Sequence, residues 1–161
     1  MKNKDLKKLT RCYLFTLLAA VLSVFCFSQT PTPIDDSHKK ISTQYHTVME
    51  SARLITNGAS KTKDDFIKNV TAAKTGLQQT KKEKENLIKI MPKKYKVIAE
   101  PFYTSIEKYQ IEAEQNAASL TEELKNKEPN QGKIIEYAKK LHGSAEKAER
   151  EHLSLKEKTK S

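Results

Sequence analysis

The chain has 161 residues, contains four glycines and no tryptophan, and carries a formal net charge of +10. This composition argues against β-sandwiches and Gly-rich phosphate-binding folds, and a chain of this length supports one modest core. Both cysteines, Cys12 and Cys26, lie near the N-terminus. If that segment is removed, the mature chain has no thiol for a disulfide, a nucleophile or a Cys-ligated metal site.

Residues 12–28 form an apolar run, and five basic residues precede it. A basic flank, an apolar run and a small or polar cleavage site are typical of a secretory signal. We therefore predict a signal helix over 1–28, a Pro-containing linker over 29–33, and export to the periplasm or the medium. The alternative is an uncleaved anchor over 12–28, because about 17 apolar residues is the shortest length that spans a bilayer. An anchor would hold the rest of the chain near a membrane.

The first predicted helix of the mature chain runs from Ile34 to Thr56. Its interior positions alternate at spacings of four and three residues, which places them on one face. Asn57 and Gly58 should end this helix, since glycine adopts the left-handed conformation without penalty. The predicted interior positions are Ile34, His38, Ile41, Tyr45, Val48, Ala52 and Ile55.

The second helix should begin after Thr62, because Thr62 and Asp65 have the spacing of a capping box. Pro92 should end it. Two polar residues, Thr80 and Lys84, interrupt its apolar face and should weaken packing there. The predicted interior positions are Phe66, Val70, Ala73, Leu77, Thr80, Lys84, Leu87 and Met91.

The third helix contains Pro101, so we expect either a kink at that residue or a helix that begins there. Its apolar residues follow spacings of four, four and three, which is closer to a straight helix than to a heptad supercoil. A turn over 128–132 should follow. The predicted interior positions are Ile98, Phe102, Ile106, Tyr109, Ala113, Ala117, Leu120 and Leu124.

The fourth helix again shows a heptad row, and three of its seven interior positions are alanine. Four long helices joined by short turns predict an all-α fold, an up-down-up-down four-helix bundle over 34–158. A thin, Ala-rich helix should detach first. The predicted interior positions are Ile134, Ala138, Leu141, Ala145, Ala148, His152 and Leu155.

Positive charge concentrates between residues 81 and 96, which include seven lysines and two glutamates. In an up-down bundle this turn shares an end with the start of the first helix, so the lysines should form one positive surface. Such a surface suits anionic lipid, anionic polysaccharide or an acidic protein. The simpler interpretation is solvation, with cations placed favourably at helix C-termini. The candidate residues are Lys89, Lys93, Lys94, Lys96, Lys39 and Lys40.

His38 and His152 occupy interior positions at helix ends that an antiparallel pair brings together. A histidine pair in a bundle can hold haem or a metal ion, although a hydrogen-bonded core edge is the simpler interpretation. Glu149 and His152 have the spacing of a di-iron motif, but no second motif accompanies them. His46 and Glu50, one turn apart, suit at most a loose surface metal contact.

The sequence contains no paired-carboxylate, Ser/His/Asp or phosphate-loop pattern, so we predict neither an enzyme nor a required cofactor. We expect an exported helical bundle that binds another protein or an anionic surface, not nucleic acid. The first alternative is a periplasmic chaperone or adaptor whose bundle opens to hold clients. The second is a haem or metal carrier that uses His38 and His152. The sequence leaves the partner and the oligomeric state open.

Overall fold

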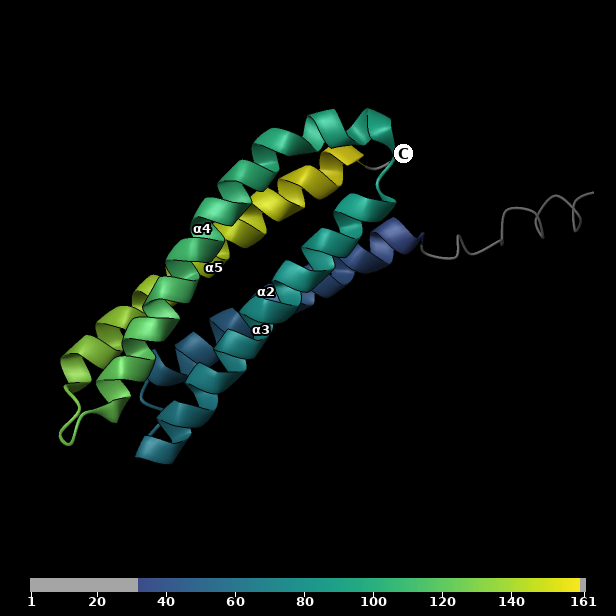
Figure 1. Ribbon diagram of the computed structural model, residues 1–161. Helices are drawn as coiled ribbons and strands as arrows, with labels where there is room; N and C mark the ends of the chain where they lie inside the picture. The colour runs from purple at the N-terminus through teal and green to yellow at the C-terminus, as the bar shows by residue number, and fades with distance from the viewer. Residues whose placement is uncertain (1–31, 160–161) are drawn as a thin grey trace, which may run out of the picture. The chain divides into compact units, whose positions relative to one another are not determined.

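The computed structural model describes residues 32–159, and this part of the chain is all-helical. Its helices are α2 (Pro33–Thr56), α3 (Lys63–Ile90), α4 (Lys93–Lys125) and α5 (Gln131–Thr159), drawn in Figure 1. The predicted signal segment over 1–28, with both cysteines, lies outside the described residues. Within residues 32–159, no helix has the length and apolar character needed to cross a membrane.

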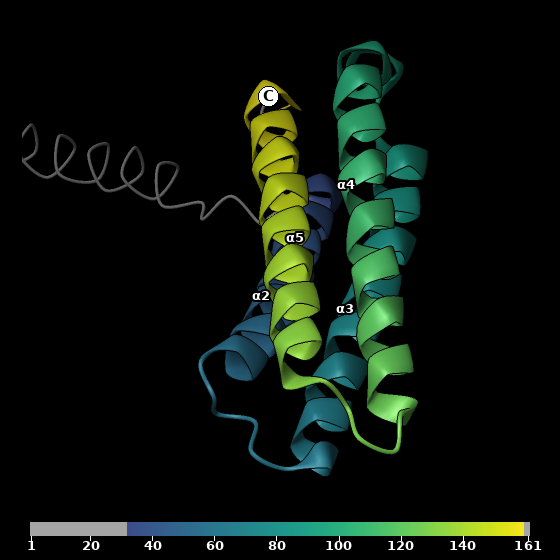
Figure 2. The ribbon, with the colours of Figure 1, turned by 90° about the vertical axis from the view of Figure 1, so that its left-hand side faces the viewer.

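The four helices form a helical bundle in which every helix packs against two others. Packing is most extensive between α4 and α5 and between α2 and α3, and least extensive between α3 and α4. Helix α2 also packs along α5. Figures 1 and 2 show the α2–α3 turn and the α4–α5 turn at one end, and the α3–α4 turn at the other.

The predicted interior faces of α2 and α5 are confirmed. In α2 every predicted position is buried except Ile34, which is half-buried against the core. In α5 all seven predicted positions are buried, and Thr159 extends the same row by another four residues. Asn57 and Gly58 follow the end of α2, and Gly58 has a φ of 75°, as a helix-terminating glycine should.

The predicted start of α3 is also confirmed. The Thr62 hydroxyl accepts a hydrogen bond from the Asp65 backbone N–H, and the Asp65 carboxylate accepts one from the Thr62 N–H. All predicted interior positions of α3 are buried except Lys84, which is half-buried. The close approach of α2 to α3 at Gly76 was not anticipated. A Cβ added at Gly76 would stand 2.9 Å from Val48 Cγ2 and 3.2 Å from the Gln44 carbonyl oxygen.

The predicted interior face of α4 is partly wrong. Ile98 is 43% exposed, whereas the neighbouring Ala99 is buried. Gln110 is buried, whereas Tyr109 is only half-buried. The interior row therefore follows the heptad spacing that we did not expect for this helix. Its members are Ala99, Tyr103, Ile106, Gln110, Ala113, Ala117, Leu120 and Leu124.

Helix α4 also begins earlier than one of our alternatives required. It starts at Lys93 and continues through Pro101, so the alternative that a helix begins at Pro101 is wrong. Proline lacks the N–H that would bond the carbonyl four residues earlier, and this weakens the ladder locally. In Figure 1 the α4 ribbon changes direction toward its N-terminal end. This early start places three lysines inside the first turn of a helix.

Candidate functional site

The turn between α3 and α4 carries exposed lysines without carboxylate partners. We call residues 89–98 the basic turn: Lys89 is in the last turn of α3, and Lys93, Lys94 and Lys96 are in the first turn of α4. All four side chains are exposed, and none forms an ion pair with a carboxylate in the part of the chain that the structure describes. Lys94 Nζ lies 4.5 Å from the centre of the Tyr95 ring, a cation–π contact.

Three of these lysines are placed against the dipole of α4. A helix N-terminus carries partial positive charge, so a cation there is destabilising and a carboxylate is stabilising. The first turn of α4 nevertheless contains no acidic residue, and Pro92 at its N-cap makes no side-chain capping bond. Favourable interaction with helix C-termini therefore accounts for Lys89 alone. The other three lysines should lower the stability of the helix that they begin.

The remaining two candidate lysines, Lys39 and Lys40, are exposed on α2. The start of α2 and the end of α5 lie at the same end of the bundle as the basic turn (Figure 1). We call this the basic end. That these lysines and the basic turn act on one partner stays a prediction.

His38 and His152 meet inside the basic end, as the sequence predicted. Both are buried, and His38 Nδ1 lies 3.2 Å from His152 Nε2. His152 Nε2 is also 3.3 Å from the His38 carbonyl oxygen, and His38 Nε2 is 3.3 Å from the Thr159 hydroxyl. One arrangement of protons allows all of these hydrogen bonds to form. His152 donates to His38, His38 donates to Thr159, and Thr159 donates to the Leu155 carbonyl oxygen at 2.9 Å.

Burial keeps both imidazoles neutral. Desolvation, reinforced by the charge of Lys156, lowers the pKa of His38 to about 4. Desolvation, together with the neighbouring His38, lowers the pKa of His152 to about 3. A neutral pair can share one hydrogen bond, whereas a doubly protonated pair would bring two positive donors together at 3.2 Å.

The contact between the histidines fits a hydrogen bond better than a metal or haem site. Within residues 32–159, no group of three or more His, Cys, Asp or Glu side chains could hold a metal ion. Axial haem ligands stand on opposite sides of the iron, so two bonds of about 2 Å would separate their nitrogens by roughly 4 Å. The two rings touch instead, with centroids 4.8 Å apart.

Glu149 is a buried carboxylate that joins α5 to α2. Its Oε1 accepts a hydrogen bond from Ser42 Oγ at 2.7 Å and lies 3.4 Å from His46 Nε2. Glu50, which lies one turn from His46, accepts hydrogen bonds from two nitrogens of Arg53. The serine donates to the carboxylate and not to the histidine, so these residues are not ordered as a nucleophilic triad.

The middle of the bundle holds polar atoms that packing leaves without partners. Among the described residues, the Tyr45 hydroxyl and Gln110 Oε1 are buried and make no hydrogen bond, while Gln110 Nε2 donates to the Leu77 carbonyl oxygen at 3.2 Å. Burial and the charge of Glu149 raise the pKa of Tyr45. Thr80, which we expected to weaken packing, is buried, and its hydroxyl donates to the Gly76 carbonyl oxygen at 2.9 Å.

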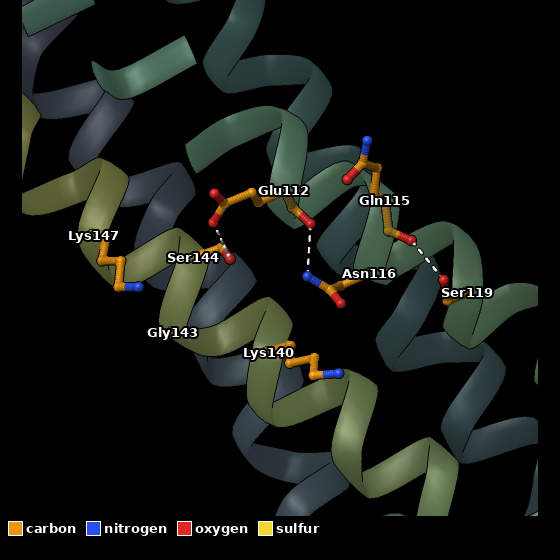
Figure 3. A pocket seen from close by; sticks show the side chains of 8 residues that line it. All are labelled: Glu112, Gln115, Asn116, Ser119, Lys140, Gly143, Ser144 and Lys147. Carbon is orange, nitrogen blue, oxygen red and sulfur yellow. Dashed lines mark hydrogen bonds between the residues drawn. The ribbon is translucent and has the colours of Figure 1, made fainter. Parts of the chain in front are cut away.

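A polar groove between α4 and α5 was missed by the sequence analysis (Figure 3). Glu112 lies on one wall. Ser144 Oγ donates to Glu112 Oε2 at 3.4 Å, and Asn116 Nδ2 donates to the backbone carbonyl oxygen of Glu112 at 2.7 Å. Lys140 and Lys147 lie on the other wall, on either side of Gly143. The only sequence signal was the run of small residues Gly143 and Ser144 in mid-helix. Part of its lining is already hydrogen-bonded, because Ser144 bonds Glu112 across the groove and Ser119 Oγ donates to the Gln115 carbonyl oxygen within α4.

Comparison of the chain with models of protein families, with curated proteins and with solved structures gives no match.

Proposed function

We propose that this protein is an exported, non-enzymatic helical bundle that binds an anionic partner at its basic end. The topology that goes with this proposal is up-down-up-down. Helices adjacent in sequence pack together, α2 closes the ring against α5, and the connecting turns are short, which is the arrangement expected of antiparallel neighbours. The oligomeric state is left open.

One observation carries the proposal. Lys93, Lys94 and Lys96 occupy the first turn of α4, where cations lower stability, and none is neutralised by a carboxylate within residues 32–159. Sequences depart from local stability rules chiefly at functional sites. An anion bound there would interact favourably with the lysines and with the helix dipole together.

Elution of the full chain from immobilised heparin, an anionic polysaccharide, tests the charge requirement. A triple variant of Lys89→Gln, Lys93→Gln and Lys96→Gln should elute at clearly lower salt, since fewer cations release fewer counterions. The matched control removes three exposed lysines from the opposite end of the bundle: Lys61→Gln, Lys63→Gln and Lys127→Gln. Equal elution shifts for the two triple variants would reduce the effect to net charge and contradict the proposal.

Export is tested separately, by N-terminal sequencing of the protein recovered from the cell envelope and medium. Cleavage after Ser28 predicts a product that begins at Gln29. A product that keeps residues 12–28 would favour the anchored alternative, and a product confined to the cytoplasm would contradict export.

A chaperone role is the second candidate, and two features favour it. The α3–α4 contact is the least extensive in the bundle, and the buried Tyr45 hydroxyl and Gln110 Oε1 lack partners among the described residues. Buried polar atoms without partners lower the cost of opening a core. Suppression of the thermal aggregation of a model client by the purified protein would support this role, and no suppression at a tenfold excess would contradict it.

A further inference from the structure

We propose that the basic turn docks on the surface of an anionic lipid bilayer, with Val97 entering the interface between headgroups and acyl chains. This inference rests on the proposed preference for an anionic partner and names that partner. It is carried by apolar side chains that the charge argument does not use.

The basic turn exposes large apolar side chains among its lysines. Val97 is 75% exposed, Ile90 is 45% exposed and Ile98 is 43% exposed. Residues 89–98 contain four lysines and no aspartate or glutamate. The other exposed large apolar residues in the described part of the chain, Ile67, Ile111 and Leu153, are far from one another in the sequence. Single exposed apolar residues need no explanation, whereas three beside four cations do.

Helix geometry places these apolar side chains directly beside the charges. Lys93 and Val97 are four residues apart on α4, as are Lys94 and Ile98, so each lysine shares a helix face with an apolar side chain. A lysine can lay its alkyl stem along apolar surface and keep its amine at the headgroups. Interfacial binding elements combine the same two features, apolar side chains below and lysines level with anionic headgroups.

Lipid fits this surface better than the other anionic partners. A polysaccharide or an acidic peptide would pair with the amines but leave Val97 in water. A bilayer that contains anionic lipid pairs with the amines and also removes Val97 from water. Each lysine near such a surface contributes attraction that falls off within a Debye length, so binding should require anionic lipid and weaken in high salt.

The absence of tryptophan from the sequence allows a direct test in the full chain. Val97→Trp introduces a single reporter at an exposed site, and its emission reports on the basic turn itself even if residues 12–28 also contact lipid. We expect its emission to move to shorter wavelength with phosphatidylglycerol vesicles. We expect no such change with phosphatidylcholine vesicles or with heparin. Unchanged emission with phosphatidylglycerol vesicles, or an equal change with both lipids, would overturn the inference.

Ile67→Trp is the matched control, because Ile67 is also exposed and lies about 35 Å from Ile90 along α3. Its emission should not change with either lipid, and a change equal to that at position 97 would overturn the inference. Adding the Lys89, Lys93 and Lys96 to Gln changes to Val97→Trp should raise the lipid concentration for half-maximal change by roughly 100-fold. The Lys61, Lys63 and Lys127 to Gln changes should have little effect, and equal effects of the two sets would contradict the inference.

A Val97→Ser and Ile98→Ser double variant distinguishes this inference from the proposed function. It should lose most of its binding to phosphatidylglycerol vesicles and still elute from heparin like the parent protein. Vesicle binding unaffected by the double variant would overturn the inference and leave the charge-based function standing. Loss of both kinds of binding would assign the apolar residues to general anion binding and would also overturn the inference.

Discussion

The N-termini of α3 and α4 differ in their side-chain capping and in the sign of the charge in their first turns. Helix α3 begins with a reciprocal capping box between Thr62 and Asp65, and both Asp64 and Asp65 stand at the positive end of its dipole. Helix α4 begins after Pro92 with no side-chain cap and with three lysines in its first turn. The first start follows the rules of helix stability, and the second departs from them. This difference is the basis of our proposal that the residues around Lys93 serve binding at the expense of stability.

The two ends of the bundle also differ in how they are stabilised. At the end opposite the basic end, side chains bind backbone groups in both turns: Ser60 Oγ donates to the Leu54 carbonyl oxygen, and Glu123 accepts from the Asn130 N–H at 2.8 Å. The basic end is held by the buried contact between His38 and His152. The end opposite the basic end therefore depends in part on the Glu123 carboxylate, whose pKa is lowered by the hydrogen bond from the Asn130 N–H, whereas the basic end depends on two imidazoles that are neutral when buried. As pH falls from 6.5 to 5, protonation should therefore affect the basic end first.

Acid should have the largest effect on the difference between the two ends of the bundle. Both histidine pKa values are lowered on folding from about 6.5 to about 4 and about 3, so the unfolded chain binds more protons. The stability that the pair contributes is present above pH 6.5 and is lost as pH falls toward 4. The free energy of unfolding should fall between pH 6.5 and 5 with a slope approaching about 1.4 kcal/mol per pH unit for each histidine.

Urea unfolding at a series of pH values measures that slope. Hydrogen exchange at pH 5 locates the loss, which should be greatest at the start of α2 and the end of α5. A His38→Gln variant should be less stable at pH 7 and show a shallower slope. A free energy of unfolding that stays constant between pH 6.5 and 5 would contradict the account of the pair.

Charge reversal at the start of α4 should remove the difference between the two helix starts. Lys93→Glu with Lys94→Glu should raise the free energy of unfolding by about 1 kcal/mol, because carboxylates suit a helix N-terminus, and should abolish retention on heparin. Lys89→Glu is the control: Lys89 lies in the last turn of α3, so reversal there should weaken binding and lower stability together. Lower stability in both variants would refute the dipole argument.

Removal of the N-cap of α3 should lower the free energy of unfolding. Thr62→Ala loses the hydroxyl that accepts from the Asp65 N–H, and the free energy of unfolding should fall by about 1 kcal/mol. Thr104→Ala is the comparison, since Thr104 is exposed within α4 and its hydroxyl only bonds the Glu100 carbonyl oxygen. Chemical denaturation of both variants should show a loss for the first alone.

The smallest effect is expected in the middle of the bundle, away from both ends. Gly143→Ala should stabilise by about 0.5–1 kcal/mol, because no atom lies within 4 Å of the added Cβ and alanine is the better helix former. Gly76→Ala should not show this rise in the free energy of unfolding, since its Cβ would stand 2.9 Å from Val48 Cγ2. Thermal unfolding midpoints that rise equally would show that α2 and α3 are not in such close contact.

The sequence predicted the helices and most of the core because heptad spacing is strong in α2 and α5. It predicted the histidine contact for the same reason, since His38 and His152 continue those rows. It failed in α4, where the interior row includes Ala99 and Gln110 while the larger Ile98 is exposed. Counting apolar residues favoured Ile98 and Tyr109, and only the packing of α4 against α3 and α5 reveals that a small and a polar residue are inside.

The position of the lysine cluster relative to the start of α4 also could not be predicted from the sequence. It depended on whether Lys93 to Lys96 belonged to a turn or to a helix, and Pro101 suggested a later helix start. The α4–α5 groove was missed because its walls come from residues such as Glu112 and Lys140 that no sequence motif connects. Close approach at Gly76 requires knowledge of the neighbouring helix.

The position of Thr159 makes the last turn of α5 part of the protein interior. Its hydroxyl accepts from His38 more than a hundred positions away in sequence, and it is itself buried. Ending the chain after Lys158 would leave an imidazole N–H without a partner and should cost about 1–3 kcal/mol of stability. Affinity tags intended for this protein should therefore be joined beyond Thr159, through a spacer that leaves the last helical turn intact.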